Sequence, residues 1–153
     1  MKTLRPWMIG LLLCLCVIGS FFYVSKHAQT APVIVSGSVA LEPDLEKEAR
    51  YNSHIFVVLF DEESPMPMPY AAARYKLTSE PKAGTFFSFF LTEQNTQIMN
   101  PGRKQPKKLR VKVRLDADGV AGADKVGDIT GELRSLPWGS ENVRISLNNM
   151  KRS

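Results

Sequence analysis

The chain contains little cysteine or histidine and no catalytic signature, and these absences exclude several classes of protein. Its two cysteines, Cys14 and Cys16, lie near the N-terminus, so the remaining chain cannot form a disulfide or bind metal through thiolate. Residues 31–153 contain one histidine, His54. No P-loop, G-x-S-x-G or H-E-x-x-H motif accompanies it, and no nucleophile and base can be paired. We therefore expect a protein that is not an enzyme and needs no cofactor.

A strong excess of charge is also absent from most of the chain. The net charge is +5, but Lys2, Arg5 and Lys26 lie ahead of the main domain and leave 17 basic residues against 15 acidic ones. A nucleic-acid-binding domain normally carries a larger basic excess. We expect no nucleic-acid partner and, without a catalytic motif, no small-molecule substrate.

One long apolar run is present, over residues 7–24, and it contains both cysteines. About 18 residues at about 1.5 Å each span roughly 27 Å, which is close to the hydrocarbon thickness of a bilayer. A cleaved signal peptide is the alternative, but both cleavage contexts are poor, since Pro32 follows Ala31 and Lys26 lies at the minus-three position of the site at Ala28. The run therefore favours an uncleaved membrane anchor.

The anchor fixes the expected organisation of the chain. Lys2 and Arg5 precede the run, which favours an internal N-terminus. We predict a cytoplasmic N-terminus over residues 1–6, a transmembrane anchor over 7–24 with Trp7 to Val24 in the lipid bilayer, and a linker over 25–32. A periplasmic domain over 33–148 and a C-terminal tail over 149–153 follow. The expected location is a bacterial inner membrane, crossed once.

The domain reads as a series of short strands separated by turns that contain glycine or proline. The predicted strands cover residues 33–41, 54–60, 71–77, 85–91, 108–115, 128–134 and 142–147. Residues 44–50 suit one helical turn, and residues 116–119 (DADG) suit a tight turn. Short strands without long amphipathic helices predict an all-β fold, namely an immunoglobulin-like antiparallel β-sandwich of about seven strands.

Three of these strands have distinctive patterns. The continuous apolar run 54–60 (HIFVVLF) predicts a central strand buried on both faces. Residues 85–91 (TFFSFFL) carry four phenylalanines, and we expect them to be the largest contributor to the core. Residues 108–115 (KLRVKVRL) alternate strictly between basic and apolar side chains, which predicts a strand with one wet face.

Loops held by a rigid sandwich commonly carry recognition, so the stiff proline-rich loop 65–69 and the loop 99–102 are the predicted contact surfaces. The predicted partner-binding residues are Met66, Met68, Tyr70, Arg74, Met99, Arg103 and Lys104. The methionines could instead bind Cu(I), with His54 as a further ligand, which makes a periplasmic copper-binding domain one alternative. A general envelope interaction module is another.

Charged residues gather in two regions of the sequence. Basic residues cluster over 103–114, whereas acidic residues cluster over 42–48 and 61–63, so we expect an electrically polarised domain. The basic strand face has two interpretations: lysines that protect a sheet edge from unwanted pairing, or a docking surface for an acidic partner or anionic lipid. Residues 116–119 also resemble the start of a calcium loop, but position 127 is glycine where an EF-hand requires glutamate, which favours an ordinary turn.

In order along the chain, several segments resemble the C-terminal domain of the CycH-type c-type cytochrome biogenesis proteins, which are membrane-tethered apocytochrome chaperones. The segments are residues 55–60 (IFVVLF), 70–74 (YAAAR), 90–93 (FLTE), 99–102 (MNPG), 113–115 (VRL) and 127–131 (GDITG). The chain lacks the tetratricopeptide array that fuller members use to hold apocytochrome. The resemblance therefore implies an accessory or docking role, with membrane-bound cytochrome c maturation components as partners.

Overall fold

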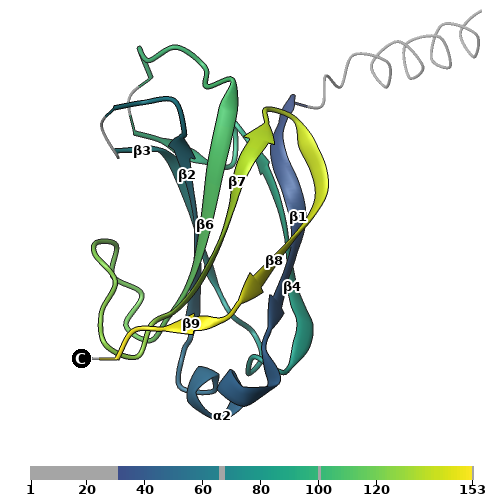
Figure 1. The fold of residues 1–153 in the computed structure, drawn as a ribbon, viewed down its shortest axis with the longest axis vertical. Coiled ribbons are helices and arrows are strands. Elements are labelled where there is room, and N and C mark those ends of the chain that lie inside the picture. Colours follow the sequence, from purple (N-terminus) through teal and green to yellow (C-terminus); the bar gives the residue numbers. More distant parts are fainter. Residues whose placement is uncertain (1–30, 66–67, 100, 153) are drawn as a thin grey trace, which may run out of the picture. The chain divides into compact units, whose positions relative to one another are not determined.

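A computed structural model of the chain describes residues 31–65, 68–99 and 101–152 (Figure 1). The predicted cytoplasmic N-terminus, the apolar run 7–24 and nearly all of the linker 25–32 lie outside the described residues, as does Met66 of the predicted contact loop. Within the part of the chain that the structure describes, no helix is both long and apolar enough to span a membrane.

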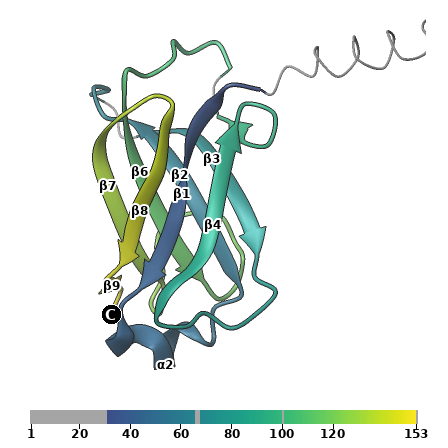
Figure 2. The ribbon, with the colours of Figure 1, turned by 90° about the vertical axis from the view of Figure 1, so that its right-hand side faces the viewer.

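Two β-sheets face each other across a common core (Figures 1 and 2). The three-stranded sheet has the order β4 (Gly84–Thr92), β1 (Val33–Leu41) and β8 (Ser140–Leu147). The six-stranded sheet has the order β5 (Gln97–Ile98), β3 (Pro69–Lys76), β2 (His54–Asp61), β6 (Lys108–Asp116), β7 (Ile129–Pro137) and β9 (Asn149–Met150). The predicted all-β sandwich is confirmed.

One strand pair departs from the predicted antiparallel arrangement. β1 and β8 run parallel, with Val39 opposite Ile145 and Leu41 opposite Leu147, whereas every other pair in the described sheets is antiparallel. The reason is the turn after β7, which carries the chain from the six-stranded sheet to the three-stranded sheet. There the Gly139 N–H donates to the Ile34 carbonyl at 2.9 Å, so β8 starts beside the start of β1.

All seven predicted strands are present, and the structure adds two short ones. Residues 71–73 form part of β3 although three consecutive alanines favour helix, because β3 pairs with β2 along its whole length. Asn149 and Met150, which we expected in a C-terminal tail, form β9 against β7, with Met150 opposite Ile129. The predicted helical turn is present as a 3₁₀ turn, η1 (Pro43–Leu45), and a short helix, α2 (Glu46–Ala49).

The core follows the period-2 pattern of the central strands. On β2 and β6 the inward residues are fully buried, at 0 % exposure: Ile55, Val57, Leu59, Val111, Val113 and Leu115. Neighbouring strands contribute Val35, Leu91, Ile129 and Ile145, also at 0 % exposure. The core therefore consists mainly of aliphatic side chains contributed by both sheets.

The aromatic segment 85–91 contributes less to the core than we expected. Phe89 is 4 % exposed, but Phe90 is 52 % exposed, and Phe86 and Phe87 are only partly buried. Successive side chains of a strand point to opposite faces, and β4 is an edge strand whose outer face is not covered by another element of the described chain. The expectation that this segment dominates the core is wrong.

Two glycines allow strands to approach closely. A Cβ atom at Gly37 would lie 2.1 Å from the Val143 carbonyl oxygen, and one at Gly131 would lie 2.1 Å from the Ser146 carbonyl oxygen. Both contacts involve β8, which pairs with β1 and packs against β7. Glycine at these two positions therefore lets β8 lie close to β1 in its own sheet and to β7 in the six-stranded sheet.

The basic strand does not protect a sheet edge, because β6 lies between β2 and β7. Its charges and those of the preceding loop are also not separated from the acidic residues. Arg103 pairs with Asp61 at 3.3 Å, and Arg110 pairs with Glu132 at 3.6 Å. The edge-protection interpretation is wrong, and the predicted charge polarisation fails where Asp61 contacts Arg103.

Candidate functional site

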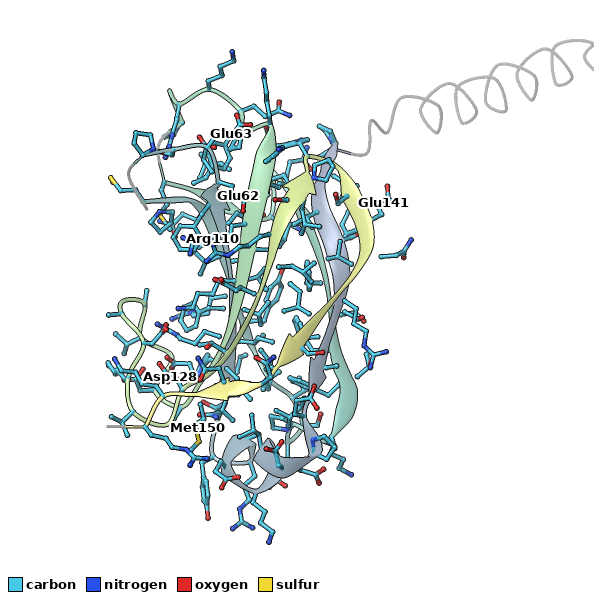
Figure 3. All side chains as sticks on the ribbon, in the orientation of Figure 1. Glu62, Glu63, Arg110, Asp128, Glu141 and Met150 are labelled. Carbon is cyan, nitrogen blue, oxygen red and sulfur yellow. The ribbon has the colours of Figure 1, made fainter. Side chains whose placement is uncertain are left out.

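A groove lies on the outer face of the six-stranded sheet, the face turned away from the core. The strand register aligns Phe56, Val58 and Phe60 of β2 across from outward residues of β3 and β6. The groove has a volume of about 270 Å³, and its apolar lining consists of Phe56, Val58, Phe60, Pro69, Ala72, Met99 and Ala121. Figure 3 shows Arg110 on this outer side of the sheet. We call it the outer-face groove.

Two arginines of β6 cover the aromatic rings in its floor. The Arg110 guanidinium lies 4.2 Å from the centroid of the Phe60 ring, and the Arg114 guanidinium lies 4.7 Å from that of Phe56. A guanidinium at this distance is attracted to the face of an aromatic ring. The two stacks hold the phenylalanines in place, and Val58 lies between them on the strand.

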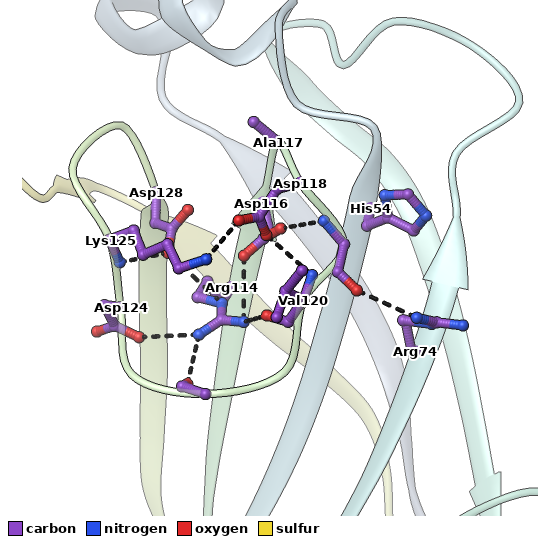
Figure 4. A network of polar contacts seen from close by, with 12 residues as sticks. His54, Arg74, Arg114, Asp116, Ala117, Asp118, Val120, Asp124, Lys125 and Asp128 are labelled. Carbon is purple, nitrogen blue, oxygen red and sulfur yellow. Dashed lines mark hydrogen bonds and ion pairs between the residues drawn. The ribbon is translucent and has the colours of Figure 1, made fainter.

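Arg114 is the centre of a buried network of polar contacts at one end of the groove (Figure 4). Its side chain is 6 % exposed and lies 3.1 Å from Asp116 and 3.7 Å from both Asp124 and Asp128. It also donates to the carbonyl oxygens of Gly122 at 2.7 Å and Val120 at 2.9 Å. Arg114 therefore fastens the loop between β6 and β7 over the sheet, and the predicted wet face of β6 is wrong at this position.

The turn at the start of this loop has the predicted chemistry. Gly119 has a φ of 69°, and its N–H donates to the Asp116 carboxylate at 2.6 Å. The Val120 N–H donates to Asp118 at 2.9 Å, and Asp118 also pairs with Lys125. The carboxylates that resembled a calcium loop are thus occupied by backbone N–H groups and cations. In the described residues, no cluster of His, Cys, Asp and Glu side chains is suited to hold a metal ion.

The carboxyl groups of this turn have pKa values shifted in opposite directions. Burial raises the pKa of Asp116, against the opposing effects of the Gly119 N–H and the Arg114 guanidinium. The hydrogen bond from Lys125 lowers the pKa of Asp118 to about 2, and the Val120 N–H adds to this effect. The hydrogen bond to Asp118 raises the pKa of Lys125 in turn. The shifts of Asp118 and Lys125 thus come from contacts within the loop, whereas that of Asp116 comes from burial.

The predicted contact residues fall at different places around the groove. Met99 lines it and is 45 % exposed, and the Met99 N–H donates to the Tyr70 carbonyl at 2.9 Å. Met68 is 56 % exposed and precedes Pro69, which lines the groove. Arg74 is exposed and donates to the Gly119 carbonyl at 3.1 Å. Met99 is thus the predicted contact residue that the structure places in the groove.

Three other predicted contact residues do not line the groove. Tyr70 is only 6 % exposed, and its ring meets Trp138 edge-on with the centroids 5.7 Å apart. The prediction that Tyr70 is a surface contact residue is therefore corrected: its ring is a core side chain. Arg103 is tied to Asp61, and Lys104 is exposed on the loop before β6.

The copper set that we considered is not brought together around His54. His54 pairs with Lys76 at one end of β3, whereas Met99 is bonded to Tyr70 near the other end. Tyr70 and Lys76 are separated by about 20 Å at the usual rise of a strand. His54 instead contacts Ser53, with its Nδ1 atom 2.9 Å from the hydroxyl oxygen, so a site that combines it with Met99 is excluded.

The sequence did not point to the outward residues of β2 as a site. The sequence predicted that Phe56, Val58 and Phe60 lie on one face of a strand that is buried on both faces. It predicted a solvated face for the alternating basic residues of β6. A signal was available when the two strands are considered together. An apolar outer face on one strand predicts that side chains of a neighbouring element cover it. Arginine stems supply part of that cover here.

No family model matches the chain, and searches of curated proteins and of solved structures found no match.

Proposed function

We propose that the protein is a membrane-anchored periplasmic docking protein that acts in c-type cytochrome biogenesis through protein–protein contacts. The observation that carries the docking role is the outer-face groove, in which apolar side chains from β2 and β3 meet Met99 on a stable sheet. Methionine is flexible and polarisable, which suits a surface that adapts to an apolar partner. The involvement of cytochrome maturation rests on the resemblance of the segments described above.

We also propose that the sandwich is of the immunoglobulin-like type. Two facing sheets with short connections support this assignment. In such a frame the strands hold the groove rigid while the loops around Met68 and Met99 supply variable contacts. The anchor over residues 7–24 would keep this frame at the inner membrane, within reach of membrane-bound maturation components.

The partner is expected to present apolar side chains to the groove. Arg110 and Lys112 are partly exposed at its side but are already paired with Glu132 and Asp124. An acidic partner would have to replace these ion pairs, whereas an apolar side chain needs only to displace water. The contact is therefore expected to depend on Met68 and Met99 more than on the cations.

Affinity purification of the full chain from bacterial membranes tests this proposal. Wild type should retain haem-lyase components, and the double variant Met68→Ser, Met99→Ser should retain about tenfold less. Both methionines are exposed, so the thermal unfolding of this variant should be nearly unchanged. Phe90→Ser is the matched control, because it removes a similarly exposed apolar side chain from the other sheet.

Equal capture by wild type and the methionine variant would remove the groove from the proposal. Capture of other envelope proteins without any haem-lyase component would support the general envelope interaction module instead. Loss of capture in both the methionine variant and Phe90→Ser would show that the contact is not confined to this face.

A further inference from the structure

A second groove lies at the α2 end of the sandwich, away from the outer-face groove. It has a volume of about 600 Å³, which is within the range of ligand sites. Its lining comes from α2, from the segment that leads into β2, from both ends of the β6–β7 loop and from the residues around β9. Figures 1 and 2 show α2 and the C-terminal end at the same end of the sandwich, and Figure 3 shows Met150 there. We call it the α2-end groove.

Its apolar lining is unusually exposed. Tyr51 and Val126 are each 70 % exposed, the highest values among the large apolar side chains of the described chain. Met150 is partly buried and lines the same groove. Exposed apolar side chains that lie together with polar groups around them are typical of interaction sites.

Four exposed cations surround these apolar residues: Lys47, Arg50, Lys151 and Arg152. Glu48 is the one acidic residue among those that line the groove. Arg50 lies 4.9 Å from the centroid of the Tyr51 ring and donates to the Tyr51 hydroxyl at 2.9 Å. A net positive rim around an apolar floor favours a ligand that is both anionic and apolar.

Asn52 supplies an independent sign of a ligand. It lines the groove and is 6 % exposed, and its backbone N–H donates to the Ala49 carbonyl at 2.9 Å. Its side-chain Nδ2 is buried and has no hydrogen-bond partner among residues 31–65, 68–99 and 101–152. A buried amide donor without an acceptor is costly, and a ligand that brings an acceptor removes this cost.

We propose that the α2-end groove binds a short peptide segment that carries apolar and acidic side chains together. The apolar side chains would lie on Tyr51, Val126 and Met150, and the carboxylates would meet the exposed cations. Nδ2 of Asn52 is covered in the free protein, so binding would turn this amide towards the groove, where a peptide carbonyl would accept from it. A fatty acid fits less well. Its single carboxylate would lie among the exposed cations, so its hydrocarbon chain would cover Asn52 and leave the buried amide without an acceptor.

Binding of a short fluorescent peptide in which aspartate and leucine alternate tests the proposal. The protein is the full chain in nanodiscs of phosphatidylcholine, and fluorescence anisotropy is the readout. We expect saturable binding that weakens as salt is raised, and no saturable binding of the matching peptide of lysine and leucine. Asn52→Ala should weaken binding about tenfold, since it removes the buried donor.

A second variant keeps the test independent of Asn52. Lys151→Glu combined with Arg152→Glu should also weaken binding about tenfold, whereas Lys107→Glu combined with Lys108→Glu, at exposed positions where β6 begins, should bind as wild type does. Thermal unfolding of Asn52→Ala should be unchanged or improved, because an unpartnered donor is lost. Equal binding by wild type, Asn52→Ala and the Lys151 and Arg152 variant would overturn the proposal, as would equal binding of the two peptides.

Discussion

Arg110 and Arg114 lie on the same face of β6 and make the same kind of stack on a phenylalanine of β2, yet their surroundings differ. The Arg110 side chain is 23 % exposed and has one ion pair, with Glu132. The Arg114 side chain is 6 % exposed and lies among three aspartates and two carbonyl oxygens. The β6–β7 loop covers Arg114, which lies at one end of the groove together with Phe56, whereas no loop contact holds Arg110. The Arg114 stack is thus part of the fold, and the Arg110 stack is the more exposed of the two.

The largest expected effect comes from removing the covered arginine. Arg114→Met should lower the free energy of unfolding by about 3 to 5 kcal/mol, because Asp116, Asp124 and Asp128 would lose their shared cation. Urea unfolding followed by circular dichroism measures this change. Arg110→Met is the control and should cost below about 1 kcal/mol, as expected for a partly exposed pair. Similar losses in both variants would contradict the contrast between the two arginines.

A smaller effect is expected from the turn that starts the covering loop. Gly119 has a φ of 69°, and a Cβ atom there would lie 2.7 Å from the His54 ring. Gly119→Ala should cost about 1 to 2 kcal/mol from the left-handed backbone, plus the cost of moving His54. Gly127→Ala is the control, because Gly127 also has a positive φ but the new methyl group would lie in open space. Urea unfolding should therefore show the larger loss for Gly119→Ala, and equal losses would mean that the His54 contact is unimportant.

The stack at the open end should contribute less. A double-mutant cycle with Arg110→Met and Phe60→Leu should give a coupling energy of about 0.5 to 1 kcal/mol, the usual range for an exposed cation–π pair. The coupling would be read from urea unfolding of the four proteins. Zero coupling would show that Arg110 covers Phe60 without stabilising it.

The smallest effect concerns acid stability. The pKa of Asp118 is lowered from 3.8 to about 2, so its contribution to stability is present above pH 3.8 and is lost as the pH falls towards about 2. Asp118→Asn should therefore flatten the loss of stability of the protein over this range, as measured by thermal unfolding in buffers of decreasing pH. Asp116 acts in the opposite direction, because burial raises its pKa and folding then favours its protonated form. An unchanged acid dependence in Asp118→Asn would rule out the Lys125 contact as its cause.

Sequence patterns predicted the strands well because each strand has a local signature. The alternation of β6 correctly placed Val111 and Val113 in the core and Arg110 and Arg114 on the opposite face. It could not show that a loop folds over Arg114, since this cover depends on contacts between residues far apart in the chain. The prediction that Phe90 belongs to the core was wrong for a related reason. The sequence of its own segment does not indicate which face of an edge strand is covered.

The candidate site was less predictable than the fold. The predicted loops led to Met99, but the floor of the outer-face groove depends on the register of β3, β2 and β6, which no single segment contains. Tyr70 shows the limit of reasoning from loops alone, because it directly follows the proline-rich loop and yet belongs to the core.

The pairing of β1 with β8 has a consequence for how the protein is made. β1 is the first described strand to leave the ribosome, and its parallel neighbour β8 is one of the last. On one side β1 can pair with β4 earlier, but its other edge stays open until nearly the whole domain has been synthesised. Such a long-range pairing slows folding and leaves the nascent sheet exposed. Completion of the sandwich therefore waits until β8 has been synthesised, and substitutions in β8 should reduce the yield of folded protein more than its final stability would suggest.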